Sequence, residues 1–430
     1  MRVKNVNIGI LGLGTVGGGV VNVLTRNQAE ITRRSGKNIT ITHAAVRDIN
    51  QDRICSTDDI SLTQDPFEIV NNNDIDVVLE LVGGTGLAKD LVEQAIKNGK
   101  HVITANKALI AIHGNELLEL AKANNTHLLF EAAVAGGIPI LKSLEQGLSA
   151  NQVELVAGII NGTGNFILTE MRDKGRDFDD VLKEAQALGY AEADPTFDVE
   201  GIDAAHKLAI LGSIAFGCKL QFDNISTEGI SQISGEDVAF ATELGYSIKH
   251  LGIAKKIDNK VQMRVHPTLI PKTSLLANVD GVMNAVLVKG NAVGPTLYYG
   301  AGAGDEATAS AVIADLIDII KDTVSHDILG WQNFEDCPAC DTNDIESVFY
   351  LRLLATDKPG VLADITAIFA NHSISVEAVV QKQIDSKNNA HIAIITNMIK
   401  TSELNEAVAE IQKNDFIQED VKIIHIETLD

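Results

Sequence analysis

Short apolar runs alternate with amphipathic stretches along the first 150 residues. This alternation is typical of β-α-β units and predicts a parallel sheet with helices on its faces. Residues 77–79 (Val-Val-Leu) fit this prediction, because a strand buried on both faces of a parallel sheet is apolar throughout. The predicted strands are 6–11, 39–46, 77–81, 101–104 and 128–131, and the predicted helices are 16–25 and 87–98.

The pattern changes between about residues 150 and 320. Apolar and polar positions alternate over 261–269 and 285–290, as they do in antiparallel strands with one solvated face. A further strand is predicted over 153–161, with helices over 179–188, 203–216 and 307–320. We therefore expect an α+β unit here, in which substrate chemistry could be located.

The last 84 or so residues form a third pattern after a polar stretch, 325–344, which we interpret as a linker with Trp331 as a packing anchor. The predicted order is strand 348–355, helix 360–371, strands 374–383 and 391–397, helix 402–414 and strand 421–427. This βαββαβ order is that of a small ferredoxin-like unit. The predicted fold class is thus α/β, with a parallel-sheet domain first, an α+β unit second and a ferredoxin-like βαββαβ unit last.

Composition argues against several binding partners and against a metal or redox role for the cysteines. The net charge of −23 argues against nucleic acid and anionic membranes as partners, because both require clustered Lys and Arg. We find no apolar segment long enough to span a bilayer and no cleavable leader, so we expect a cytoplasmic protein. Cys337 and Cys340 form a CxxC pair. A zinc site would need a second pair of ligands, which the sequence lacks, and the acidic neighbours of this pair disfavour a reactive thiolate. We therefore interpret this segment as an ordinary loop.

The clearest motif is Gly-x-Gly-x-x-Gly, formed by Gly12, Gly14 and Gly17. It follows an apolar strand and opens a helix, which is the context of a dinucleotide-binding turn. The glycines permit the tight turn and a close approach of the backbone to a pyrophosphate, which the helix N-terminus attracts. At the end of the second predicted strand, Arg47 is suited to the 2′-phosphate of NADP(H). The adjacent Asp48 is suited to the free ribose hydroxyl of NAD(H), so NAD(H) remains the alternative cofactor.

Two lysines are candidate catalytic residues. Lys107 follows the end of a predicted strand, where ligands bind in open α/β sheets, although a surface lysine would also fit there. Asp203 and Lys207 are four residues apart on a predicted helix that continues as an apolar run, which favours a buried pair over a solvated one. His206 points away from Lys207, so we expect a structural role for it.

Reduction of an aldehyde by a nicotinamide requires a proton for the developing alkoxide, and a lysine can supply it. No cysteine lies where an acylating aldehyde dehydrogenase would need its nucleophile. The residues therefore favour carbonyl reduction. A non-catalytic amino-acid sensor and a dehydrogenase of another small aldehyde remain as alternatives.

Five motifs, in order along about 320 residues, resemble those of homoserine dehydrogenase. They are 12–17, 106–107, 135–140, 161–165 and 189–207. The resemblance implies reversible reduction of L-aspartate 4-semialdehyde to L-homoserine with NAD(P)H, a step in threonine, methionine and isoleucine biosynthesis. It also implies a monofunctional chain.

The resemblance further implies roles for individual residues. Lys207, Lys107 and Asp203 match the catalytic positions, and Glu192, Asp203 and Asp198 match the substrate site. The cofactor positions are Gly12, Leu13, Gly14, Thr15, Val16, Gly17, Arg47, Thr85, Lys107, Gly189 and Gly304. A monovalent cation, usually sodium, is implied at Glu131, Val134, Gly136 and Ile138. The chain departs from the family after Gly304, where Asp305 and Glu306 are more acidic than expected and Ala307 replaces a usual proline.

The tail resembles an ACT domain, with Asp357, Pro359, Gly360, Val361 and Leu362 in its ligand loop. The resemblance implies threonine as a feedback inhibitor, with a purely dimerising module as the alternative, and a homodimer or homotetramer. The expected domains are a Rossmann-type domain (1–135), a substrate-binding, catalytic and dimerisation domain (136–325) whose closing helix could return to the first, a linker (326–346) and the ACT domain (347–430).

Overall fold

The first part of the chain folds around a six-stranded parallel sheet. The computed structural model describes residues 5–324, 327–383 and 389–429. The sheet has the order β3-β2-β1-β4-β5-β6, which is the order of a doubly wound nucleotide-binding fold. Its strands are β1 (Asn5–Leu11), β2 (Asn38–Ala45), β3 (Ser61–Thr63), β4 (Val77–Glu80), β5 (His101–Thr104) and β6 (Leu128–Leu129). The predicted parallel sheet is confirmed.

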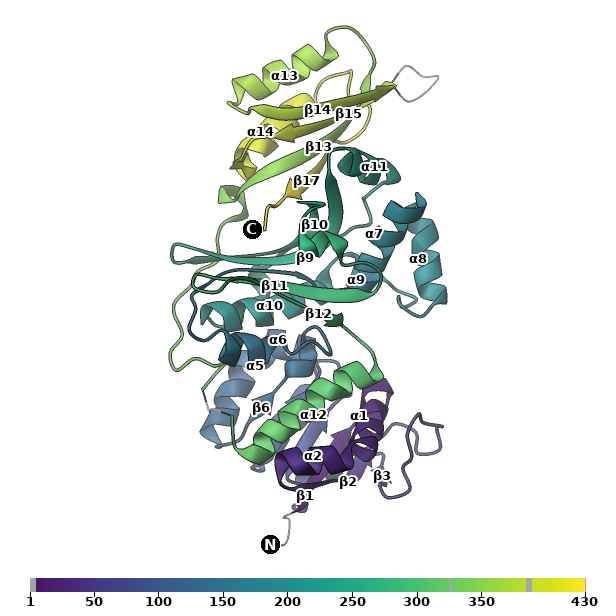
Figure 1. Cartoon of the computed structure of the whole chain (residues 1–430), viewed down its shortest axis with the longest axis vertical. Helices are drawn as coiled ribbons and strands as arrows, with labels where there is room; N and C mark the ends of the chain where they lie inside the picture. The colour runs from purple at the N-terminus through teal and green to yellow at the C-terminus, as the bar shows by residue number, and fades with distance from the viewer. Residues whose placement is uncertain (1–4, 325–326, 384–388, 430) are drawn as a thin grey trace.

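Both faces of this sheet are buried because alternate strand residues enter different cores. Ile8, Ile10 and Leu79 pack into one cluster, and Val78 and Val102 into another. The first cluster lies under α1 (Thr15–Arg26), α2 (Gln28–Ser35) and α12 (Asp305–Lys321), and the second under α3 (Pro66–Asn71), α4 (Leu87–Lys97) and α5 (Lys107–Ala123). Helix α12 therefore returns from the middle of the chain to pack against α1 (Figure 1).

The middle of the chain adds antiparallel strands and helices. The strands are β7 (Val153–Ile159), β8 (Ser226–Thr227), β9 (Tyr246–Ile257), β10 (Lys260–Pro271), β11 (Met283–Gly290) and β12 (Gly294–Ala301). The helices are α6 (Ile140–Lys142), α7 (Gly162–Lys174), α8 (Phe178–Ala187), α9 (Thr196–Val199), α10 (Ile202–Phe216) and α11 (Gly235–Glu243). Helix α10 packs on β9 and β10 and also on α5 of the first unit. The two units are thereby joined through a shared core.

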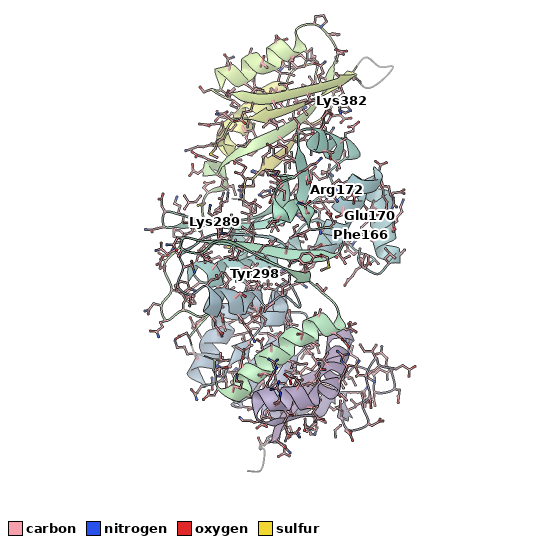
Figure 2. The ribbon with its side chains drawn as sticks, in the orientation of Figure 1. Phe166, Glu170, Arg172, Lys289, Tyr298 and Lys382 are labelled. Atoms are coloured by element: carbon pink, nitrogen blue, oxygen red, sulfur yellow. The ribbon has the colours of Figure 1, made fainter. Side chains whose placement is uncertain are left out.

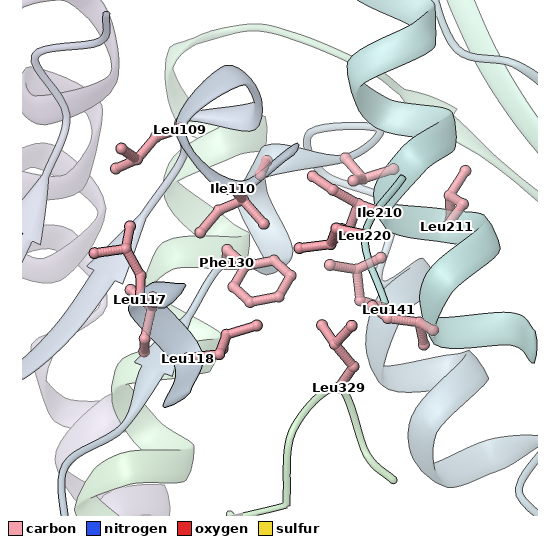
Figure 3. Packing of buried hydrophobic residues seen from close by; sticks show 14 of the residues in the cluster. Leu109, Ile110, Leu117, Leu118, Phe130, Leu141, Ile210, Leu211, Leu220 and Leu329 are labelled. Atoms are coloured by element: carbon pink, nitrogen blue, oxygen red, sulfur yellow. The ribbon is translucent and has the colours of Figure 1, made fainter. Parts of the chain in front are cut away.

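Figure 3 shows this shared core, with Phe130 at its centre. Ile110 and Leu117 come from α5, and Ile210 comes from α10. All three side chains are fully buried. Because the interior of a protein is close-packed, this contact fixes the position of α10 relative to the nucleotide-binding sheet.

The C-terminal unit has the predicted βαββαβ order. Its elements are β13 (Glu346–Thr356), α13 (Val361–Asn371), β14 (Val376–Gln383), β15 (Asn389–Thr396), β16 (Ile399–Lys400), α14 (Thr401–Ile411) and β17 (Lys422–Ile426). Strand β17 also pairs in parallel with β10, where Thr268 lies opposite His425 and Leu269 opposite Ile426. The middle and C-terminal strands consequently form one eleven-stranded sheet, visible as a continuous stack in Figure 1.

The connecting segment 327–345 lies against the middle unit. The indole nitrogen of Trp331 donates a hydrogen bond to the carbonyl oxygen of Ile214, at 2.7 Å, which agrees with its predicted role as an anchor. Leu329 and Cys337 are buried in the shared core. The burial of Leu329 and Cys337 and the hydrogen bond from Gln221 to the carbonyl oxygen of Cys337 were not predicted, because they depend on partners far away in the sequence.

Among residues 5–324, 327–383 and 389–429, no helix is long and apolar enough to cross a membrane. Their His, Cys, Asp and Glu side chains form no group of three or more suited to a metal ion.

A buried ion pair joins the C-terminal unit to α11. The Nε of Arg352 lies 2.6 Å from Oδ1 of Asp237, and these side chains are 6% and 1% exposed. The hydroxyl of Tyr350 donates to the same carboxylate. Lys382, labelled in Figure 2, pairs with Glu243 at the same interface, but both of these side chains are about half exposed.

We predict that Arg352→Met costs about 3–5 kcal/mol of unfolding free energy, because it leaves the Asp237 charge buried without its partner. The control, Lys382→Met, should cost less than about 1 kcal/mol, because its ion pair is exposed. Urea unfolding followed by circular dichroism measures both. Equal effects of the two substitutions would contradict this account of the interface.

Candidate active site

A cavity of about 630 Å³ lies between the first and middle units. It opens beyond the carboxyl ends of the parallel strands, where ligands of doubly wound folds bind. Val16, Lys107, Asn161, Thr163, Gly189, Glu192, Asp198, Asp203, Lys207 and Gly304 are among its lining residues. Gly136 also lines the cavity, so the structure brings residues from all five motifs identified in the sequence, and Gly304, to one cavity.

The glycine loop forms one wall, and each glycine has a separate reason to be there. Gly12 has φ +95°, which side-chain-bearing residues rarely adopt. A Cβ atom on Gly17 would lie 2.2 Å from the carbonyl oxygen of Gly12, so only glycine permits the helix to start this close to the strand. A Cβ on Gly14, in contrast, would meet nothing within 4 Å. Gly14 is the N-cap of α1, whose first N–H groups have no side-chain cap and can receive an anion.

Asp203 is the centre of the polar wall. Its Oδ2 accepts a hydrogen bond from Nζ of Lys207 at 2.7 Å, and its Oδ1 lies 3.0 Å from Nζ of Lys107. Burial acts to raise the pKa of Asp203, but the two lysines outweigh it and hold that pKa well below its usual range. The side chains of Asp203 and Lys207 are 7% and 11% exposed, so this is not a solvated surface pair.

Lys207 is held at a second point. Its Nζ also donates to the carbonyl oxygen of Ile160, at 2.7 Å, at the end of β7. Lys107 is the first residue of α5, whose N-cap Asn106 accepts a hydrogen bond from the backbone of Leu109. The two ammonium groups therefore reach Asp203 from different units, one along α10 and one from the start of α5.

Asp198 lies beside this group on the short helix α9. Burial raises its pKa; a hydrogen bond from Asn161 opposes that shift, and the nearby charge of Asp203 adds to it. Glu192 is exposed, on the turn after α8, and lines the same cavity. The hydroxyl of Thr163 donates to the carbonyl of Tyr190 and ties this turn to α7.

His206 takes no part in the cavity. Its Nδ1 contacts the carbonyl oxygen of Ile202 at 2.9 Å, and its ring stacks with those of Phe197 and Phe222. Burial lowers its pKa. These contacts agree with the structural role predicted for it.

Residues 305–307, where the chain departs from the family pattern, begin helix α12. Asp305 and Glu306 form the first turn of α12, where negative side chains favour the positive end of the helix dipole. Glu306 also pairs with Arg26 of α1, at 2.6 Å. A Cβ on Gly137 would lie 3.2 Å from the Cβ of Ala307, so the two backbones approach closely there. Gly304 itself has φ +122° and lines the cavity.

The other residues predicted to bind the cofactor lie away from Lys107 and Lys207. Arg47 is exposed just after β2, and Thr85 lies in the loop after β4; neither lines the cavity. Leu13 is buried in the core below the glycine loop. Thr15 is the first residue of α1. Arg47 and Thr85 would require a long ligand that extends beyond the cavity, as a dinucleotide does.

The residues assigned to a cation lie in a buried turn after β6. Both oxygens of the Glu131 carboxylate accept backbone N–H groups, from Leu141 and Lys142, at 2.9 Å each. Burial, with the charge of Asp315 adding to it, raises the pKa of Glu131 to about 8. Gly136 has φ +51°, and a Cβ there would lie 2.5 Å from the carbonyl oxygen of Gly302. Val134 and Ile138 are also buried.

Sequence reasoning missed Asn161, although it singled out the motif that contains it. The side chain of Asn161 contacts both Asp198 and Asp203. Asn161 is the last residue of the predicted strand 153–161, and no helix was predicted directly after it; asparagine is a favourable N-cap residue, but its contacts with the carboxylates depend on the tertiary structure.

Together, the doubly wound sheet, the glycine loop and the lysine–carboxylate group define an NAD(P)-dependent oxidoreductase that acts on CH–OH groups. Residues 12–131 match the profile of the homoserine dehydrogenase NAD-binding domain, residues 139–317 that of homoserine dehydrogenase, and residues 349–416 that of the ACT domain. The chain belongs to the homoserine dehydrogenase family, as its motifs predicted.

Individual relatives support this assignment over the full length. The chain is 52% identical to homoserine dehydrogenase of Pseudomonas aeruginosa, over 99% of this chain and 100% of the relative. A crystal structure of the enzyme from Thiobacillus denitrificans matches with a TM-score of 0.95 at 54% identity, covering 100% and 99% of the two chains. A hyperthermophilic archaeal homoserine dehydrogenase in complex with NADPH matches with a TM-score of 0.61 at 25% identity, over 77% of this chain and 100% of that one. A non-catalytic sensor is therefore the wrong alternative.

We predict that Gly17→Ala lowers both stability and NADPH affinity, because its Cβ would meet a backbone oxygen. Gly14→Ala is the matched variant, because its Cβ meets no protein atom, yet it occupies space at the helix N-terminus where we expect the pyrophosphate. We expect Gly14→Ala to melt within a few degrees of the wild type and to lose roughly tenfold in NADPH affinity, or about 1.4 kcal/mol. Thermal melting and NADPH fluorescence titration measure the two effects, and unchanged NADPH binding by both variants would contradict the assignment of the loop.

Proposed function

We propose that this enzyme reversibly reduces L-aspartate 4-semialdehyde to L-homoserine in the cavity between the first two units. The observation that carries the proposal is the position of Lys207, whose ammonium group is fixed by Ile160 and Asp203 at the cavity wall. The nicotinamide, when bound, supplies or accepts the hydride. The protein must then supply the proton and hold the substrate.

Lys207 is proposed as the general acid and base. In the reductive direction it donates a proton from Nζ to the developing alkoxide oxygen and becomes neutral; in the oxidative direction the neutral amine removes the hydroxyl proton. Lys107, also paired with Asp203, supports the negative charge on that oxygen. Asp203 holds both lysines, so that neither requires reorientation during the reaction.

Glu192 and Asp198 are proposed to bind the ammonium group of the amino-acid substrate, with Asp203 completing the site. All three carboxylates line one cavity, which supports this role. Charge-assisted hydrogen bonds to carboxylates are stronger than neutral ones and give the substrate one orientation.

The cofactor is proposed to be NADP(H), with NAD(H) as the second candidate. Its pyrophosphate would lie on the 12–17 loop, and Thr85, Gly189 and Gly304 would contact the rest of it. Arg47 is exposed at the end of β2, and among the described residues its side chain has no recorded acidic partner, which leaves the guanidinium available to a 2′-phosphate.

A sodium ion is proposed at the turn that contains Glu131, Val134, Gly136 and Ile138. The donors would be mainly backbone carbonyl oxygens, because both carboxylate oxygens of Glu131 already accept backbone N–H groups. Hard monovalent cations prefer such oxygen donors. The left-handed conformations of Ala135 and Gly136 make the turn tight, which supports convergence of several carbonyls.

Threonine is proposed as a feedback inhibitor at the ACT turn 357–362, in a homodimer or homotetramer. Gly360, with φ +100°, is the N-cap of α13, and no side chain caps the first N–H groups of that helix. Val361 is buried, while Pro359 and Gly360 are exposed. A helix N-terminus favours the carboxylate of a small amino acid, which supports this turn as its receptor.

We predict that Lys207→Ala lowers the turnover of homoserine oxidation by about 10²–10⁴-fold, the usual contribution of a general acid or base. NADPH affinity should remain near that of the wild type. Lys183→Ala, at an exposed lysine on α8, is the control and should retain full turnover. Assays with NAD⁺ and NADP⁺ in parallel also decide the cofactor preference. Near-normal turnover of Lys207→Ala would exclude the proposed role.

We predict that Asp357→Ala weakens threonine inhibition by roughly tenfold or more, consistent with the loss of about one hydrogen bond to a charged group. Asp364→Ala, one turn into α13, is the control and should be inhibited like the wild type. Point substitutions are needed because β17 lies between β10 and β13 in one sheet, so removing the C-terminal unit would expose the middle one. A wild type that is insensitive to threonine would contradict threonine as the effector and leave a purely dimerising module as the alternative.

A further inference from the structure

The side chain of Asn161 makes three hydrogen bonds at the candidate active site and uses both of its N–H donors. Asn161 is 6% exposed and lies between β7 and α7. Its Oδ1 accepts a hydrogen bond from the backbone N–H of Gly164 at 2.8 Å and caps α7. Its Nδ2 donates to Oδ1 of Asp198 at 2.8 Å and to Oδ2 of Asp203 at 3.0 Å. The orientation of the amide follows from these partners, because only its NH₂ group can donate to the carboxylates.

This amide separates two negative charges. Asp198 and Asp203 both line the cavity, and like charges at short range raise the pKa of the less stabilised group. Asp203 has two lysines as direct partners, whereas the only direct side-chain partner recorded for Asp198 among the described residues is Asn161. The two N–H groups of one amide therefore satisfy one oxygen on each carboxylate and fix the distance between them.

The same segment also positions Lys207. The carbonyl oxygen of Ile160, the residue just before Asn161, accepts a hydrogen bond from Nζ of Lys207. Strand β7 is paired on both sides, with β9 and β11, so the backbone at its end is firmly held. Two consecutive residues thus contact the ammonium of Lys207 and both carboxylates next to it.

We propose that Asn161 is a positioning residue that fixes the carboxylates of Asp198 and Asp203 relative to Lys207 and to the substrate. The proposal rests on the proposed function, because it assigns Asn161 to the ammonium site and the proton donor described above. Asn161 acts through these three side chains and needs no contact with the reacting atoms.

Two substitutions separate the bridging role from the capping role. Asn161→Asp and Asn161→Ser both retain an oxygen that can cap α7, since Asp and Ser are as favourable at the N-cap as Asn. Neither can donate two hydrogen bonds to the carboxylates. Asn161→Asp also adds a negative charge, whereas Asn161→Ser does not.

The expected readout is the pH profile of homoserine oxidation. The charged groups around Lys207 are Asp203 on its own helix, Asp198 on α9, Lys107 on α5 and Glu192 on the turn after α8. In Asn161→Asp the added carboxylate favours the ammonium form of Lys207, so the acidic limb of kcat/KM should move to higher pH by about one unit, equivalent to 1.36 kcal/mol. In Asn161→Ser that limb should stay in place while the KM for homoserine rises by roughly tenfold, because Asp198 loses the hydrogen bond that orients its carboxylate toward the substrate.

Asn165→Ser is the matched control. Asn165 is a buried asparagine one turn further along α7, and its Nδ2 donates to the carbonyl oxygens of Val279 and Met283 instead of to carboxylates. This substitution should lower the melting temperature without moving the pH profile or the KM.

The outcomes distinguish the two levels of the proposal. A wild-type enzyme that fails to oxidise homoserine would overturn the proposed function itself. A wild-type enzyme that oxidises homoserine, with an unchanged KM in Asn161→Ser and an unchanged acidic limb in Asn161→Asp, would overturn the role of Asn161 alone. If Asn161→Asp does not fold, the KM of Asn161→Ser relative to that of Asn165→Ser decides the question.

Discussion

The candidate active site depends on one buried carboxylate. Asp203 is almost fully enclosed, and a charge in that position is stable only if cations and hydrogen-bond donors surround it. Lys207 comes from its own helix, Lys107 from the start of α5 in the nucleotide-binding unit, and Asn161 from the end of β7. The requirement to satisfy Asp203 therefore brings three elements together where the two units meet, and the cavity forms around them.

The attachment of the C-terminal unit also leads back to this region. Strand β17 continues the sheet on which α10 packs, and Trp331 and Glu335 of the connecting segment bond to the last turn of α10 and to the glycine after it. The helix that bears Asp203 and Lys207 at its start is thus held at its end by the segment that leads to the ACT domain. The buried pair between Arg352 and Asp237 adds a third attachment. The ACT domain is therefore part of the same packed structure as the middle unit.

Local patterns predicted many elements correctly and missed others for identifiable reasons. The βαββαβ tail and the parallel strands have clear apolar periodicity and were found. Strand β9 was missed because Lys249 and His250 interrupt its apolar pattern, although both are buried. Lys249 is satisfied there by Asp280 and by the carbonyl of Val279. Helix α5 was also missed, so Lys107 was expected after a strand and not as the first residue of a helix.

The sequence by itself determined the nucleotide-binding turn, the order of the domains and the Asp203–Lys207 pair, because each depends on residues close together in the chain. Turn chemistry, apolar periodicity and i, i+4 spacing are local properties. Only the tertiary structure decided that Lys107 and Asn161 would meet Asp203 and that β17 would join the sheet of the middle unit. Those contacts link residues from about 40 to about 160 positions apart, and their formation depends on the packing of whole helices and strands.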